Sequence, residues 1–176
     1  MSALPPYEGL HPLVVHFPIG ILLIAWLPMV IGLIDKKRRS GWLASAGLLL
    51  IVGTVAAFAA VLTGEAADEI VVSTSDAMKR AVHEHEEAAE FARNLFILVT
   101  VLFIAVWVAA SKVAEKKRAM VASIGGVLVA IAYSYGAFTL ANAGHLGGLL
   151  VHHYGIHAPM NAGELPAGAS IERHDD

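Results

Sequence analysis

Four long apolar runs dominate the pattern of hydrophobic and polar positions along the chain. They cover residues 14–34, 42–63, 91–111 and 119–141. Each run is close to the ~20 residues that an α-helix needs to cross the hydrocarbon core of a bilayer. The pattern therefore predicts an all-α fold in the form of a four-helix transmembrane bundle.

The segments between the runs differ in charge, and this difference predicts how the bundle is oriented. Basic residues gather in residues 35–39 and 112–118, whereas the connection 64–90 is rich in Asp and Glu. Because short cytoplasmic loops carry an excess of Lys and Arg, both basic loops are expected on the cytoplasmic side. The N-terminus, the C-terminus and the acidic connection are then expected on the non-cytoplasmic side of a multi-pass protein of the bacterial inner (cytoplasmic) membrane.

The composition agrees with a chain that lies in a lipid bilayer. Hydrophobic residues make up 57% of the sequence and charged residues only 15%, which is less charge than a water-facing surface carries. The net charge of -3 argues against nucleic acid as a partner, because phosphate binding needs a clustered basic face. Cysteine is absent, which excludes disulfides, thiolate metal sites and covalently attached haem.

The chain reads as one membrane domain over residues 1–157, followed by a tail. Residues 158–176 are rich in Pro, Gly and polar residues, a composition typical of a flexible segment.

Small residues predict where the helices approach each other closely. On the second run they are spaced alternately four and three apart, the spacing that lets helix backbones pack together in lipid; they are Gly53, Ala57, Ala60 and Gly64. Gly126, Ala130 and Ala137 form a similar stripe on the fourth run. Such faces serve packing within the bundle, against a partner subunit or in a homo-oligomer.

The histidines are the main functional signal. All nine fall in the non-cytoplasmic half of the predicted topology, and none lies in a basic loop. They are His11, His16, His83, His85, His145, His152, His153, His157 and His174. A single histidine at a membrane interface needs no explanation, but a cluster from three separate helices indicates a site.

His85 lies on a continuous apolar stripe that runs from Met78 to Phe103 at alternating spacings of four and three, so we expect it to face the bundle. His83 falls on the opposite, polar face. Ala89 and Ala92, one and two turns below His85, leave space beside its imidazole. Two interpretations remain open: His85 is a cofactor ligand, or it is a packed histidine bonded to a neighbouring helix.

The first and last helices each offer further histidines. His16 stands one turn above Gly20, while His11 precedes the first run and is expected to cap the helix or line its mouth. His145 and His152 share a face if the fourth helix continues past Gly144. The glycines at this point predict equally well a break and a re-entrant segment.

Imidazoles projecting from facing helices, without thiolates, are typical of the axial ligands of haem b. His16, His85 and His145 are the preferred candidates for binding the haem iron, with His11 and His152 as reserves and with Gly20, Ala89 and Ala92 providing room. Expected porphyrin walls are Phe17, Phe91, Phe96 and Phe138, and Arg93 or Tyr135 are candidates for binding the propionates.

Two other functions stay open on the sequence. One is zinc or copper binding by the histidine cluster with Glu65, Asp68 or Glu84. The other is a cofactor-free structural subunit of a membrane redox complex. In the haem case the protein is an electron carrier rather than a stand-alone enzyme, and its partners are quinone, a periplasmic cytochrome or a membrane redox complex.

Two strings resemble the signature segments of a family of uncharacterised bacterial four-helix membrane proteins, known as a domain of unknown function. They are HPLVVHFPIG at residues 11–20 and GHLGGLLV at residues 144–151. The resemblance covers residues 10–157 and implies a four-span bundle with recurrent histidines at His11, His16, His85 and His145. After Val151 the chain departs from the family's usual order of Tyr, a variable residue, His and Gly.

Overall fold

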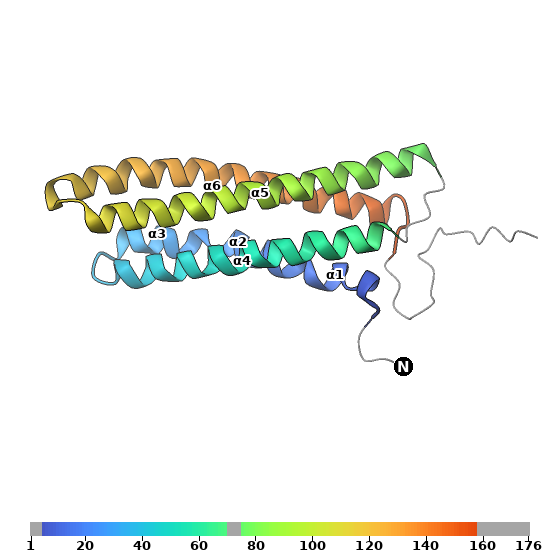
Figure 1. The fold of residues 1–176 in the computed structure, drawn as a ribbon, viewed down its shortest axis with the longest axis horizontal. Helices are drawn as coiled ribbons and strands as arrows, with labels where there is room; N and C mark the ends of the chain where they lie inside the picture. Colours follow the sequence, from blue (N-terminus) through green and yellow to red (C-terminus); the bar gives the residue numbers. More distant parts are fainter. Residues whose placement is uncertain (1–4, 70–74, 158–176) are drawn as a thin grey trace, which may run out of the picture.

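The computed structural model describes residues 5–69 and 75–157, and every regular element in these two ranges is helical. Figure 1 shows long, nearly parallel rods, and the short helices at the start of the chain lie in line along the first of them. In order the elements are η1 (Tyr7–Gly9), α1 (His11–Val14), α2 (His16–Ile24), α3 (Trp26–Ile34), α4 (Arg39–Asp68), α5 (Asp76–Lys112) and α6 (Glu115–His152). The predicted tail 158–176 lies outside the described residues.

Four of these rods are long and apolar enough to cross a membrane, as the sequence predicts: His11–Ile34, Arg39–Asp68, Asp76–Lys112 and Glu115–His152. Large apolar side chains such as Leu33, Val55 and Ile131 are more than half exposed on the outside of the bundle. A surface of this kind suits lipid rather than water.

The first rod consists of three short helices because two prolines interrupt it. Pro18 and Pro28 lack the N–H that would bond to the carbonyl one turn earlier, and the rod is divided at Val15 and Ala25. Both dividing residues keep right-handed helical angles. The rod therefore keeps its direction although its hydrogen bonding is interrupted.

The rods form two antiparallel pairs. The first pair consists of α1–α3 with α4, and the second of α5 with α6, whose mutual contact is the most extensive in the bundle. Figure 1 shows the pairs as two layers. At one end lie His11, Asp68, Asp76 and His152, and we call this the histidine end. At the opposite, basic end lie Ile34, Arg39, Lys112 and Glu115.

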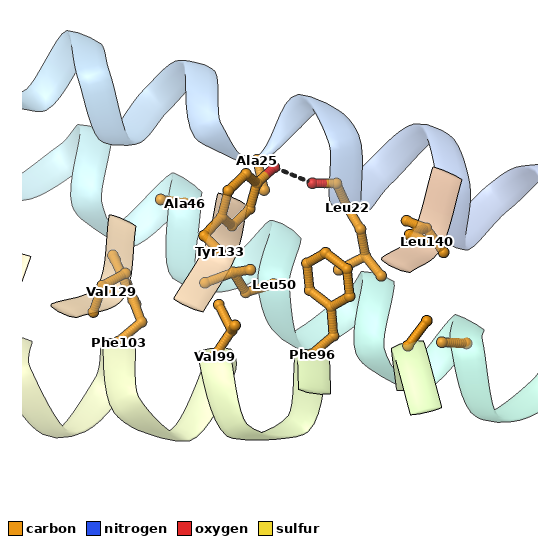
Figure 2. Packing of buried hydrophobic residues seen from close by; sticks show 12 residues of the cluster. Leu22, Ala25, Ala46, Leu50, Phe96, Val99, Phe103, Val129, Tyr133 and Leu140 are labelled. Carbon is orange, nitrogen blue, oxygen red and sulfur yellow. Dashed lines mark hydrogen bonds between the residues drawn. The ribbon is translucent and has the colours of Figure 1, made fainter. Parts of the chain in front are cut away.

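The core between the pairs is apolar and closely packed (Figure 2). Leu22, Leu50, Phe96 and Val99 are fully buried. The hydroxyl of Tyr133 on α6 donates to the carbonyl oxygen of Leu22 on α2. Thr54 and Thr100 share a hydrogen bond of 2.9 Å between their hydroxyls, so these buried polar groups are paired within the bundle.

The predicted small-residue stripe on α4 packs as expected, because Gly53, Ala57 and Ala60 are all buried. The stripe predicted on α6 is wrong by one position. Gly126 has open space around it, whereas its neighbour Gly125 is buried. The α6 sequence is apolar on every side, so hydrophobicity did not mark its packing face.

α6 runs without a break from Glu115 to His152. The re-entrant alternative for the glycine-rich segment is therefore excluded, and the fourth helix continues past Gly144. α5 has 37 residues, about 55 Å at 1.5 Å per residue, against a hydrocarbon core of about 30 Å. The long helices thus extend beyond their apolar runs at the histidine end.

Candidate functional site

A cavity of about 410 Å³ opens at the histidine end, between the two helix pairs. This volume falls in the range of small-molecule and cofactor sites. Four rods contribute to its walls, and the lining includes histidines from each pair. They are His11, His16, His85, His152 and His157.

His85 faces this cavity from α5, as the apolar stripe predicts. Its Nδ1 lies 3.0 Å from the carbonyl oxygen of Ala143 on α6. Because a carbonyl only accepts, Nδ1 carries the proton and donates, and in the neutral ring Nε2 keeps its lone pair. His83 is 68% exposed and pairs instead with Glu86 and Glu87 on its own helix.

The ring of His85 rests on a glycine of α6. A Cβ placed on Gly147 would lie 2.9 Å from Cε1 of His85, closer than non-bonded carbons approach. Gly147 therefore provides the space in which the imidazole lies against the helix. The two interpretations of His85 are compatible, because the neighbouring helix occupies only one of its nitrogens.

His11 occupies the matching position in the first pair. Its Nδ1 lies 2.9 Å from the carbonyl oxygen of Ala60 on α4 and 3.4 Å from the hydroxyl of Thr63. A Cβ on Gly64 would lie 3.2 Å from Cε1 of His11. From the sequence, His11 is only a reserve ligand candidate at the mouth of the first helix. The structure places it inside the site.

His11 and His85 stand close together across the gap between the pairs. Their ring centroids are 6.2 Å apart and their planes are inclined by 76°. Below them a second cavity of about 60 Å³ continues towards the core. Both imidazoles line both cavities, so the two rings stand where the upper space meets the lower one.

The small residues predicted beside the imidazoles are partly where they were expected. Ala89 lines both cavities, and Ala92 lines the lower one. Gly20 is exposed, has no atom near the position of a Cβ and lines neither cavity. The space that Gly20 leaves one turn from His16 therefore faces away from the site.

His16 and His152 also line the upper cavity, but not the lower one. The Nδ1 of His16 lies 2.6 Å from the carbonyl oxygen of Pro12, one turn earlier, and the side chain is exposed. Three acidic residues line the upper cavity as well, Glu65, Asp68 and Glu86. The lower cavity has no acidic residue in its lining.

The structure does not bring His145 to the site. It is exposed and lines neither cavity. The face of α6 towards the upper cavity carries Gly144, Gly147, Gly148 and Val151 instead. This corrects the expected grouping of His145 with Gly148 and His152, because His145 is turned by roughly 100° from Gly144 on a continuous helix of 3.6 residues per turn.

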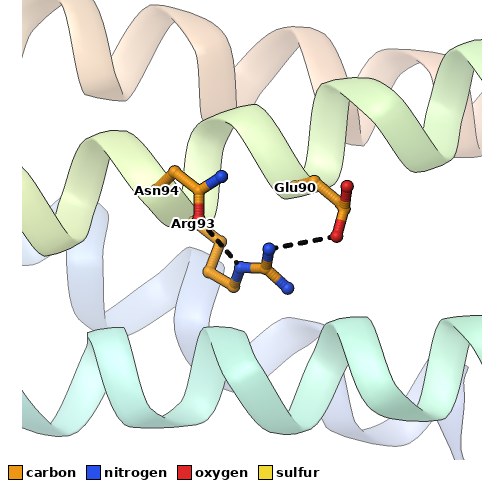
Figure 3. Close-up of polar contacts among 3 residues, drawn as sticks. All are labelled: Glu90, Arg93 and Asn94. Atoms are coloured by element: carbon orange, nitrogen blue, oxygen red, sulfur yellow. Dashed lines mark hydrogen bonds and ion pairs between the residues drawn. The ribbon is translucent and has the colours of Figure 1, made fainter.

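The aromatic and basic residues expected around a porphyrin are mostly elsewhere. Phe96 lines the lower cavity, but Phe17, Phe91 and Phe138 are at least half exposed on the outside. Arg93 also lines the lower cavity and is held in place by Glu90, whose carboxylate is 3.0 Å from its guanidinium (Figure 3). Its guanidinium carbon lies 5.2 Å from the ring centroid of Phe58. Tyr135 packs edge-on against Phe91.

Within residues 5–69 and 75–157, no three His, Asp or Glu side chains come together in a way that would hold a metal ion. Zinc sites in proteins use three or four protein ligands. The described arrangement offers two imidazoles whose ring centroids are 6.2 Å apart instead.

Sequence reasoning gave His11 only a reserve place because it precedes the apolar run and because its partner is a backbone carbonyl on another helix. A signal was present in the second helix of each pair, where alanine is followed four residues later by glycine: Ala60 with Gly64, and Ala143 with Gly147. Each pair of small residues marks the place where an imidazole lies.

No curated protein and no solved structure matches this chain. Residues 8–159 match the model of a family described as "Predicted membrane protein (DUF2231)". This range contains all four long helical rods and both cavities, and it agrees with the resemblance found at residues 10–157. The chain belongs to the DUF2231 family of predicted membrane proteins.

Proposed function

We propose that this protein binds a b-type haem between His11 and His85 and transfers single electrons at the histidine end of the bundle. The observation that carries the proposal is the pair of imidazoles, one from each helix pair, whose centroids are 6.2 Å apart. When bound, a b-type haem supplies reversible one-electron chemistry at its iron.

The hydrogen bonding of both rings supports this proposal. A histidine that binds a metal usually donates its other N–H to a carbonyl or carboxylate, which fixes the tautomer and orients the ring. His11 and His85 each make such a bond through Nδ1, to Ala60 and Ala143. In both rings Nε2 is then the nitrogen with a lone pair to offer.

The separation of the rings suits two ligands on opposite sides of one ion. Imidazole nitrogens bind metal ions at about 2.0 Å, so two opposed rings have centroids about 6 Å apart, whereas a tetrahedral angle brings them to about 5 Å. The observed distance of 6.2 Å is nearer to the first of these values, and His11 and His85 would hold the haem iron between them.

The two cavities support a flat ligand in particular. The plane midway between the rings runs between the helix pairs, and cavities of about 410 Å³ and 60 Å³ lie on either side of the rings. The lower cavity is bounded by small residues from facing helices, among them Ala57, Ala92 and Ala143. Haem needs only two protein ligands, which the described site offers, whereas zinc needs more.

We place the protein in the bacterial inner membrane with the histidine end facing the periplasm. Electrons then pass between a periplasmic cytochrome and quinone or a membrane redox complex. The site lies at one end of the bundle, so a partner has to complete any path across the bilayer.

The test is the absorption spectrum of the full chain, expressed with ample haem and purified in mild detergent, before and after dithionite. We expect a Soret band that shifts on reduction. His11→Ala and His85→Ala should each lose most of the bound haem, while His83→Ala and His145→Ala should keep it as matched controls. A wild-type protein without a Soret band would exclude the haem proposal. Metal analysis of the same sample then separates zinc or copper binding from a cofactor-free subunit.

A further inference from the structure

The two helix pairs hold their histidines in the same way. In each pair a histidine of the first rod donates through Nδ1 to an alanine carbonyl of the second, with Ala60 serving His11 and Ala143 serving His85. In each, the ring rests on the glycine four residues after that alanine. The local geometry at one histidine is therefore repeated at the other.

The repetition continues into the core. Leu22 comes eleven residues after His11, and Phe96 comes eleven residues after His85. Both side chains are fully buried, and each packs on a glycine of the second rod. Leu22 faces Gly53, and Phe96 faces Gly136. These glycines lie seven residues before Ala60 and seven residues before Ala143.

At the basic end the same positions meet again, with the large and small residues exchanged. A Cβ on Gly32 would lie 3.2 Å from Cβ of Trp42, and a Cβ on Gly125 would lie 2.5 Å from Cγ1 of Val106. Counted from His11 and His85, Gly32 and Val106 hold the same position on the first rods of the two pairs. Counted from Ala60 and Ala143, Trp42 and Gly125 hold the same position on the second rods. The glycine is on the first rod in one pair and on the second rod in the other, and the contact is kept.

We infer that the bundle consists of two copies of one two-helix unit, and that each copy contributes half of a single ligand site on the axis between them. The axis runs along the bundle because the equivalent rods run in the same direction, as in membrane proteins built from parallel repeats. The pairing explains why the buried positions of one unit recur in the other: Leu22 with Phe96, Ala25 with Val99, Leu50 with Tyr133, and Ala57 with Leu140.

The repeat assigns a positioning function to Gly64 and Gly147. Each glycine lets one imidazole lie against the second rod of its unit, at the distance where Nδ1 reaches the alanine carbonyl. The ligand class follows from the symmetry: one ligand that accepts two nitrogen donors from opposite sides. The identification of this ligand as haem rests on the proposed function. The two equivalent half-sites are inferred without it.

The half-sites are testable without ligand, by nitrogen NMR of the full chain in detergent with isotope-labelled histidine. We expect His11 and His85 both as the Nδ1–H tautomer. Gly64→Ala should shift the His11 signals, and Gly147→Ala those of His85. Gly144→Ala and Gly148→Ala are matched controls, because both residues line the same cavity but have open space where a Cβ would be; neither should shift either ring.

In the haem-loaded protein, Gly64→Ala and Gly147→Ala should weaken haem retention to a similar extent, within about threefold of each other, and both should alter the spectrum. If only one of them does so, or if either ring is the Nε2–H tautomer, the equivalence of the half-sites is disproved. If wild type binds no haem but both rings show the Nδ1–H tautomer, the half-sites stand and the proposed ligand fails.

Should a glycine variant not fold, His11→Ala and His85→Ala replace it, and each should leave the tautomer of the other ring unchanged.

Discussion

The hydroxyl of Tyr133 donates to the backbone carbonyl of Leu22 and so joins α6 to α2 across the core. This bond lies beside the division between α2 and α3 at Ala25, and it connects the two helix pairs directly. Together with the bond between Thr54 and Thr100, it is one of the buried polar contacts between the two pairs.

Tyr133→Phe is expected to lower the free energy of unfolding by about 0.5–1.5 kcal/mol, because the ring stays packed while the carbonyl loses its donor. Thermal unfolding in detergent, followed by circular dichroism, measures the change. Tyr135→Phe is the control, since Tyr135 is exposed on the same helix. An equal effect of both substitutions would contradict a specific role of the Tyr133 bond.

Gly53→Ala should destabilise the bundle by about 1–3 kcal/mol, because its Cβ would overlap a packed side chain. That Cβ would lie 2.6 Å from Cδ2 of Leu22. Combining it with Leu22→Ala should cost less than the sum of the two single changes, since the truncated side chain makes room. Gly126→Ala meets no atom and should not lower the unfolding midpoint, because alanine favours a helix more than glycine does. Strict additivity would show that Gly53 and Leu22 do not touch.

Glu86→Gln should raise the reduction potential of the haem-loaded protein. A carboxylate in the cavity wall favours the ferric state, which carries one more positive charge, so its removal favours the ferrous state. An interaction of about 1 kcal/mol corresponds to tens of millivolts for one electron. Redox titration measures the shift. Glu87→Gln is the neighbouring control, because Glu87 is 69% exposed and lines neither cavity; a fall in potential for Glu86→Gln would contradict the expectation.

The orientation predicted from loop charge can be read from cysteine labelling, because the natural chain has no cysteine. A membrane-impermeant maleimide applied to spheroplasts should modify Glu84→Cys, at the histidine end, without permeabilisation. Lys37→Cys, at the basic end, should react only after the membrane is opened. The reverse pattern would overturn the proposed orientation.

The sequence predicted the number and order of the spanning helices because the bilayer requires long apolar runs. It underestimated the length of α4 at the histidine end, which continues to Asp68 although its apolar run ends at residue 63. For α5, which begins at Asp76, the stripe from Met78 to Phe103 already predicted a helix that starts before the apolar run. Beyond the hydrocarbon core a helix no longer needs apolar side chains all round, so hydrophobicity stops marking its end.

The candidate site was predictable only where one helix face differed from the others. His85 was placed correctly because polar residues cover the opposite face of α5. His145 was misplaced because α6 is apolar on every side, so its inward face is set by which small residues fit the neighbouring helix. The contact of His11 with Ala60 joins segments distant in sequence through a backbone carbonyl, so its only trace in the side-chain types is the glycine four residues after the alanine.

The position of the cavity at one end of the long helices also decides how the membrane potential acts on the proposed reaction. Moving one elementary charge across the whole membrane changes its energy by about 2.3 kcal/mol per 100 mV. An electron that enters and leaves through the histidine end crosses little of that field. Exchange with an aqueous carrier should therefore proceed at the same rate in energised and de-energised vesicles, without either using or building the transmembrane voltage.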